Sequence, residues 1–180
     1  MLLVYTIPIQ VKPNQVKVYM TSLSPHIPTL STLLTPKPAI ADHFKVLVVI
    51  QPSGPNPLPC TRHELDAIAG HVRNKHLVKF GTTETPALVK DILLNIPAAS
   101  IVHLACHGQQ NSKPLDSALL LDDGQLKVTQ LMQLSIQKAS LVFLSACETA
   151  MGDANLPDEV IHLAAAMLFV GFCGAVGTMW

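Results

Sequence analysis

The chain has 180 residues, of which 49% are hydrophobic and 13% are charged, and its acidic and basic residues balance to no formal net charge. This length fits one domain with an ample hydrophobic core. The Lys and Arg residues are scattered singly, which excludes the basic surface of a nucleic-acid-binding protein. The four cysteines (Cys60, Cys106, Cys147 and Cys173) have no short repeating spacing, which favours free thiols in a reducing, cytoplasmic compartment.

The N-terminal segment differs in composition from the rest of the chain. Its apolar start, MLLVYTIPIQ, has no basic flank and no cleavage site, and so is not typical of a signal peptide. Residues 1–40 are rich in Pro, Ser and Thr, which predicts an extended segment or linker ahead of a domain at 41–180. Within this segment, Val16 to Met20 alternates as a short edge strand would.

Strands and helices alternate from Lys45 onward. The run KVLVVI is short, continuous and β-branched, which predicts a strand buried on both faces. The following TRHELDAIAGHVRNK predicts an amphipathic helix that starts with a capping box of Thr61 and Glu64. LVKF predicts a second strand, and TETPALVKDILLN predicts a second helix with Thr85 as N-cap and Pro86 in its first position.

The second half continues the alternation. SIVHLAC predicts a third strand, SALLLDDGQLKV a hairpin closed at Asp123-Gly124, TQLMQL a helical turn, and ASLVFLSA a fourth strand. Pro157, followed by two acidic residues, predicts the start of a last helix, and GAVGTMW predicts a final strand. This order predicts an α/β fold, with a mostly parallel sheet, helices on both faces and an inserted β-hairpin.

The uncharged stretch from residue 160 to 180 allows a second interpretation, because about 20 apolar residues can span a bilayer. However, Gly171, Gly174 and Gly177 interrupt its second half, and no Lys or Arg flanks it. A helix to about Val170, a glycine turn and a buried strand explain the same residues. We therefore expect no membrane association, and a membrane-anchored fragment is the weaker alternative.

Two predicted strands end at residues that can carry chemistry. In IVHLACHG the apolar run stops at His107, and in LVFLSACETA it stops at Cys147. In open parallel sheets ligands bind at the carboxyl ends of the strands, and neighbouring strands lie about 4.8 Å apart. An imidazole can therefore take the thiol proton and return it to a leaving amine, and Gly108 lets a backbone N–H approach an oxyanion. The pattern predicts a Cys–His catalytic dyad.

A metal site is the alternative use of this segment, since His103, Cys106 and His107 are all possible ligands. On a strand, however, Cys106 points away from the two histidines. No second pair of ligands with zinc spacing occurs elsewhere in the chain. We expect neither a metal nor another cofactor.

HLACHG, the DG hairpin, LSACETA, LPDEVIHLAAAMLFVGF and VGTMW occur in the order typical of a CHAT domain. The chain resembles this caspase- and separase-like peptidase module, which is often attached to TPR repeats. The resemblance implies a three-layer caspase-like fold and endopeptidase activity through a thioester acyl-enzyme. It assigns His107 as general base, Cys147 as nucleophile, and the backbone N–H groups of Gly108 and Cys147 as oxyanion donors. The implied partners are a protein or peptide substrate and a TPR region in cis or in trans.

The chain departs from this family in two ways. Metacaspase relatives have an acid two residues before the nucleophile, where this chain has Ser145, so no preference for a basic P1 residue follows. The family also continues past the TMW strand, so we expect the domain to be incomplete at its C-terminus. Glu148 and Asp153 are further candidates for the cleft, although Glu148 is more simply a carboxylate at a helix N-terminus. The alternative function is a catalytically inactive interaction or regulatory domain.

Overall fold

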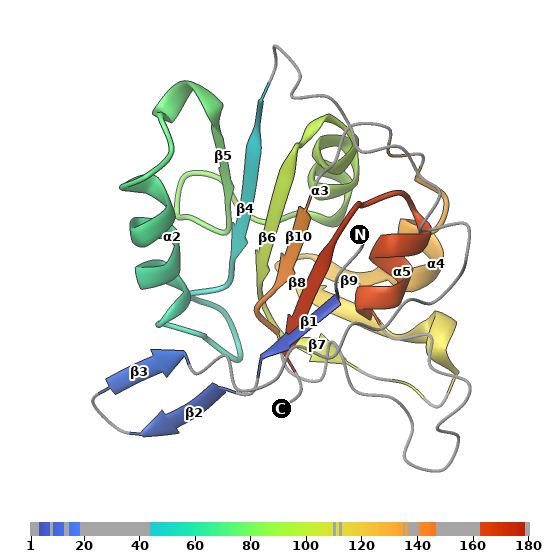
Figure 1. Cartoon of the computed structure of the whole chain (residues 1–180), viewed down its shortest axis with the longest axis horizontal. Coiled ribbons are helices and arrows are strands. Elements are labelled where there is room, and N and C mark those ends of the chain that lie inside the picture. Colours follow the sequence, from blue (N-terminus) through green and yellow to red (C-terminus); the bar gives the residue numbers. More distant parts are fainter. Residues whose placement is uncertain are drawn as a thin grey trace.

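The computed structural model describes residues 44–109, 111, 113–134, 136, 141–146 and 163–178, with the backbone of three short N-terminal strands (Figure 1). These strands are β1 (Val4–Ile7), β2 (Ile9–Lys12) and β3 (Gln15–Val18). Within the described residues, the main sheet has six strands in the order β1-β11-β10-β6-β4-β5, and all five neighbouring pairs are parallel. The mostly parallel sheet predicted from the alternating pattern is confirmed.

The strands of this sheet other than β1 are the largely apolar runs of the sequence. They are β4 (Val46–Ile50), β5 (Leu77–Phe80), β6 (Ile101–Ala105), β10 (Leu141–Leu144) and β11 (Ala175–Thr178). Every residue of β4 is buried, because β4 lies between β5 and β6 and has packed helices on both faces. This burial explains why β4 is continuously apolar and does not alternate.

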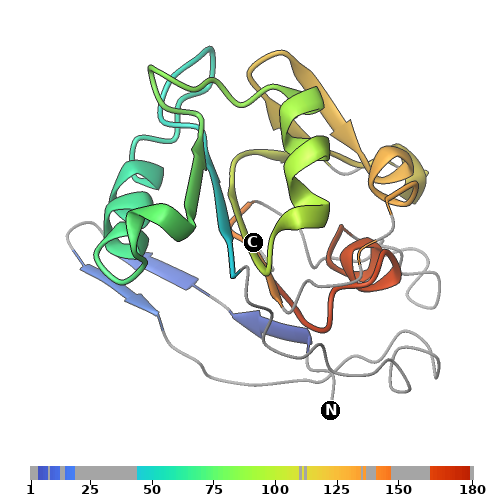
Figure 2. The same cartoon turned by 90° about the horizontal axis from the view of Figure 1, so that it is seen from above.

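Helices cover both faces of the sheet and make three layers (Figure 2). On one face, Leu65 of α2 (Thr61–Ala69) packs with Val48 and Ile50 of β4. On the other face, the core joins the sheet to α3 (Val89–Asn95), α4 (Val128–Leu131) and α5 (Leu163–Phe169). Among the described residues, short 3₁₀ helices at Asn74–His76, Ile96–Ala98 and Pro114–Asp116 lie in the connections.

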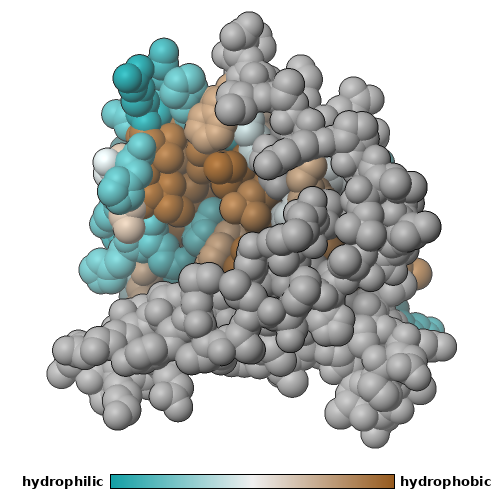
Figure 3. Space-filling model, in the orientation of Figure 1, coloured by the Kyte–Doolittle hydropathy of each residue, from teal (hydrophilic) through white to brown (hydrophobic). Residues whose placement is uncertain are grey.

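Helix α2 is amphipathic, as its sequence predicted. Leu65 is buried against the sheet, whereas Arg62, His63 and Asp66 are exposed. In Figure 3, polar side chains lie on the left of the molecule, where Figure 1 places α2, and apolar side chains are visible beside them. The polar outer face marks this layer as a surface layer over the sheet.

A small antiparallel sheet follows β6. It consists of β7 (Gly108–Gln109), β8 (Ala118–Leu121) and β9 (Gly124–Lys127), in that order. Leu121 pairs with Gly124, so the two-residue turn is Asp122-Asp123, one residue earlier than predicted. The predicted hairpin is confirmed, and it belongs to a sheet that begins directly after His107.

The predicted capping box of α2 is wrong. The N-cap residue is Cys60 and makes no side-chain capping hydrogen bond. The Thr61 hydroxyl instead donates to the carbonyl of Leu58 at 2.6 Å, and the Glu64 carboxylate turns toward the sheet. The nearby Leu58 carbonyl takes the Thr61 hydroxyl, and partners on distant strands take the Glu64 carboxylate, in place of the capping box.

Helix α3 begins at Val89, later than the predicted start at Pro86. The carboxylates of the hairpin turn reach this segment: Asp122 accepts the N–H of Ala87 at 2.7 Å, and Asp123 accepts the N–H of Val89 at 2.8 Å. The Asp123 carboxylate, from another part of the chain, therefore takes the place of the predicted N-cap Thr85. The Thr85 hydroxyl instead donates to the backbone carbonyl of Lys79.

The C-terminal apolar stretch forms α5, a turn and β11, as predicted. Gly171 makes the turn at φ +117°, where a Cβ atom would lie 2.4 Å from the carbonyl oxygen of Ile136. Strand β11 is bordered by β10 on one side and by β1 on the other, with Val4 paired to Ala175, a role for β1 that the sequence did not predict. In the described parts of the chain, no helix has the length and apolar character needed to cross a membrane.

Candidate active site

The site is built at the carboxyl ends of β6 and β10, which are neighbours in the sheet. Their parallel register pairs Phe143 with His103 and Leu144 with Leu104, and the Ser145 amide donates to the Leu104 carbonyl at 2.9 Å. The predicted adjacency of these two strands is confirmed. The predicted residues Cys147, Glu148 and Asp153 lie outside the described residues.

His107 is half-buried just beyond β6, and the loop after β4 holds it at two points. Its backbone N–H donates to Oε1 of Gln51 at 3.1 Å, and its Nε2 lies 3.0 Å from the carbonyl oxygen of Asn56. A carbonyl oxygen only accepts, so Nε2 carries the hydrogen and donates it to Asn56. In the neutral ring this leaves Nδ1 as the nitrogen with a lone pair, which is the form that a general base needs.

Gly108 is the first residue of β7 and pairs with Leu119. The flanking Leu120 amide donates to the His107 carbonyl at 2.8 Å, so Gly108 and Leu119 form a non-hydrogen-bonded pair of the antiparallel ladder. The N–H of Gly108 therefore points away from β8. This orientation leaves the Gly108 N–H outside the β7–β8 ladder.

Cys106 precedes His107 but faces the opposite side of the sheet, as strand alternation predicted. It is fully buried in the core shared with Leu104 and Val102, and this burial raises the pKa of its thiol to about 12. A thiol protonated at neutral pH is a poor nucleophile. Among the residues that the structure describes, no three His, Cys, Asp or Glu side chains are grouped to hold a metal ion.

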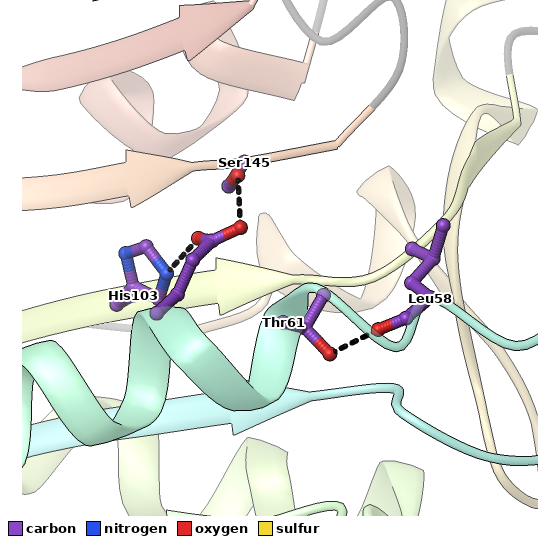
Figure 4. A network of polar contacts seen from close by, with 5 residues as sticks. Leu58, Thr61, His103 and Ser145 are labelled. Carbon is purple, nitrogen blue, oxygen red and sulfur yellow. Dashed lines mark hydrogen bonds and ion pairs between the residues drawn. The ribbon is translucent and has the colours of Figure 1, made fainter. Parts of the chain in front are cut away.

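A polar network that the sequence analysis missed lies on the α2 face of the sheet (Figure 4). Oε1 of Glu64 accepts a hydrogen bond from the Ser145 hydroxyl at 3.2 Å, and its Oε2 lies 2.8 Å from Nε2 of His103. Figure 4 shows His103 and Ser145 on either side of the carboxylate. A signal was present in the sequence: Glu64 precedes Ile68 by four residues and so shares the apolar face of the helix.

The described geometry defines a class of protein. A parallel sheet between two helical layers, with a histidine at the end of β6 and an inserted antiparallel sheet directly after it, is a caspase-like α/β domain. The CHAT domain family matches residues 4–180, and the chain belongs to this family, which is related to caspase-like peptidases. The match includes the segment before residue 41. A comparison with curated proteins gives no match.

Proposed function

We propose that the chain is a caspase-like cysteine endopeptidase module with His107 as general base and Cys147 as nucleophile. The register of β6 and β10 carries this proposal. His107 lies three residues after Leu104, Cys147 lies three residues after Leu144, and Leu104 and Leu144 are paired. Since neighbouring strands are about 4.8 Å apart, chain ends that leave paired positions can bring an imidazole and a thiol to one substrate carbonyl.

The orientation of the imidazole supports the role of His107. With Nε2–H donated to Asn56, Nδ1 is the atom that takes the proton from the Cys147 thiol. The thiolate then forms a C–S bond to the substrate carbonyl carbon, and the C–N bond breaks as Nδ1–H gives its proton to the leaving amine. Water hydrolyses the resulting thioester, with His107 again taking a proton, and so restores the thiol.

The tetrahedral intermediate needs donors for its oxyanion, and backbone N–H groups are suited to this because they are rigid and close to the reacting carbon. We assign the N–H of Gly108, which points away from β8, and the N–H of Cys147 to this role. The substrate is a protein or peptide in the cytoplasm, and a TPR region in cis or in trans is the expected partner.

Site-resolved alkylation of the chain tests this proposal. We expect iodoacetamide at neutral pH to modify Cys147 faster than the exposed Cys60, because a nearby imidazole increases the thiolate fraction. The variant His107→Ala should slow modification of Cys147 alone, and peptide hydrolysis should fall by about 10²–10⁴-fold because general-base catalysis is lost. Cys60 serves as the internal control in each sample. If Cys147 is no more reactive than Cys60, the chain is instead an inactive interaction domain.

A further inference from the structure

We propose that Glu64 is a positioning residue for the dyad. Its carboxylate joins the ends of the two strands that lead to His107 and Cys147. This inference rests on the proposed function. It concerns a carboxylate on α2 that takes no part in the chemistry itself. Its role is to hold β6 and β10 at a fixed separation just before the reacting residues.

The two oxygens of Glu64 contact different strands. Oε1 accepts from Ser145, which follows β10, and Oε2 accepts from Nε2–H of His103 in β6. His103 lies in β6, the strand that leads to His107, and Ser145 directly follows β10, two residues before Cys147 in the sequence. The carboxylate thus ties together the ends of the two strands that precede the dyad residues.

The His103 side of this bridge is buried. The side chain is only 11% exposed, and its imidazole stacks on the ring of Phe143, with centroids 5.2 Å apart and planes at 21°. Phe143 is also the strand partner of His103 in the β6–β10 register. A movement of β10 relative to β6 would therefore disturb both the ring stack and the carboxylate bridge.

Binding of a basic substrate side chain is the competing role for a carboxylate at this place. The contacts favour positioning, because each oxygen of Glu64 already accepts from a donor of the chain itself. The Glu64 side chain is also only 34% exposed. Hydrogen bonds to an ionised carboxylate are about twice as strong as neutral ones, so both partners are held firmly.

Two substitutions of Ser145 separate its hydroxyl from its size. We expect Ser145→Ala to lower kcat for peptide hydrolysis by about tenfold at unchanged KM, since the loss of a hydrogen bond to a charged group displaces the strand end. The variant Ser145→Thr keeps the hydroxyl and should retain kcat near that of the wild-type chain. If both variants remain folded by circular dichroism and kcat is the same in both, the hydroxyl has no positioning role.

Glu64→Gln tests the carboxylate itself, with Asp66→Asn as the matched control because Asp66 is an exposed acid on the same helix. The amide of Ser145 reports on the strand separation, since it donates to Leu104 across the two strands. We expect its hydrogen exchange to be about tenfold faster or more in Glu64→Gln and unchanged in Asp66→Asn. Unchanged exchange in Glu64→Gln refutes the bridge.

Substrate choice distinguishes the remaining outcomes. Peptides with a neutral or a basic P1 residue should lose kcat equally in Glu64→Gln if the carboxylate positions the strands. Loss confined to the basic peptide overturns the proposal and assigns Glu64 to substrate binding. If the wild-type chain shows neither hydrolysis nor selective alkylation of Cys147, the proposed function fails and the positioning role fails with it. An active enzyme with unchanged exchange at Ser145 refutes the positioning role alone.

Discussion

The turn between α5 and β11 gives a sharp test of how the sheet is assembled. Gly171 (φ +117°) and Gly54 (φ +112°) have nearly the same positive φ, but their surroundings differ. A Cβ at position 171 would lie 2.4 Å from the carbonyl oxygen of Ile136, whereas a Cβ at position 54 would meet no atom within 4 Å. Alanine at the two positions therefore shares the conformational cost and differs in the steric contact.

The expected magnitudes follow from these two terms. A left-handed backbone conformation costs alanine about 1–2 kcal/mol, and the reduced freedom of the unfolded chain offsets about 0.4–1 kcal/mol of that cost. We therefore expect Gly54→Ala to lower the free energy of unfolding by about 0.5–1 kcal/mol. In Gly171→Ala the Ile136 carbonyl must also move, and such overpacking adds about 1–3 kcal/mol. Its total loss should be about 1.5–4 kcal/mol.

Urea unfolding followed by far-UV circular dichroism measures both variants on the same scale. With m-values of about 1–3 kcal/mol/M, the midpoint of Gly171→Ala should lie roughly 1 M below that of Gly54→Ala, with the slope unchanged. Equal midpoints for the two variants would refute the steric argument. They would mean that backbone conformation alone accounts for the glycine at position 171.

Two further predictions concern residues next to His107. Burial raises the pKa of Cys106 from its ordinary value of 9.0 to about 12, so the folded chain keeps this proton while the unfolded chain loses it above pH 9.0. The resulting stability is fully present below that pH and falls by about 1.4 kcal/mol per pH unit as the pH rises toward 12. The free energy of unfolding of Cys106→Ala should not show this fall with pH. If the difference in free energy of unfolding between the wild-type chain and Cys106→Ala did not change with pH, the burial argument would be contradicted. Gln51→Met leaves the His107 amide without its acceptor and should lower the free energy of unfolding by about 1–3 kcal/mol. An unchanged free energy of unfolding in the same denaturation assay would contradict this hydrogen bond.

Patterns within short segments predicted much of the sheet. The continuous β-branched run at β4, the alternation of strands with helices and the opposite orientation of Cys106 all follow from local periodicity and are confirmed. The hairpin of β8 and β9 was also predicted, although its turn lies one residue earlier than the predicted turn. The parallel adjacency of β6 and β10, on which the candidate dyad depends, followed from the same alternation.

Polar side chains with a choice of partners were predicted less well. Thr61 and Glu64 have the spacing of a capping box, yet the carboxylate bonds to His103 and Ser145 from distant strands. The start of α3 depends on Asp123, which comes from a hairpin far along the chain. In each case the local partner was available, and a partner brought close by folding took its place.

The amino-acid sequence by itself determined the layered α/β class, the main strands and the strand end that carries His107, because hydrophobic periodicity is a local property. Only the tertiary structure decided the order of the other strands, the addition of β1 beyond β11, the carbonyl of Asn56 that orients the imidazole and the two strands that Glu64 joins. A polar group bonds to whichever buried partner the folded chain brings within reach, and no spacing along the sequence records that choice.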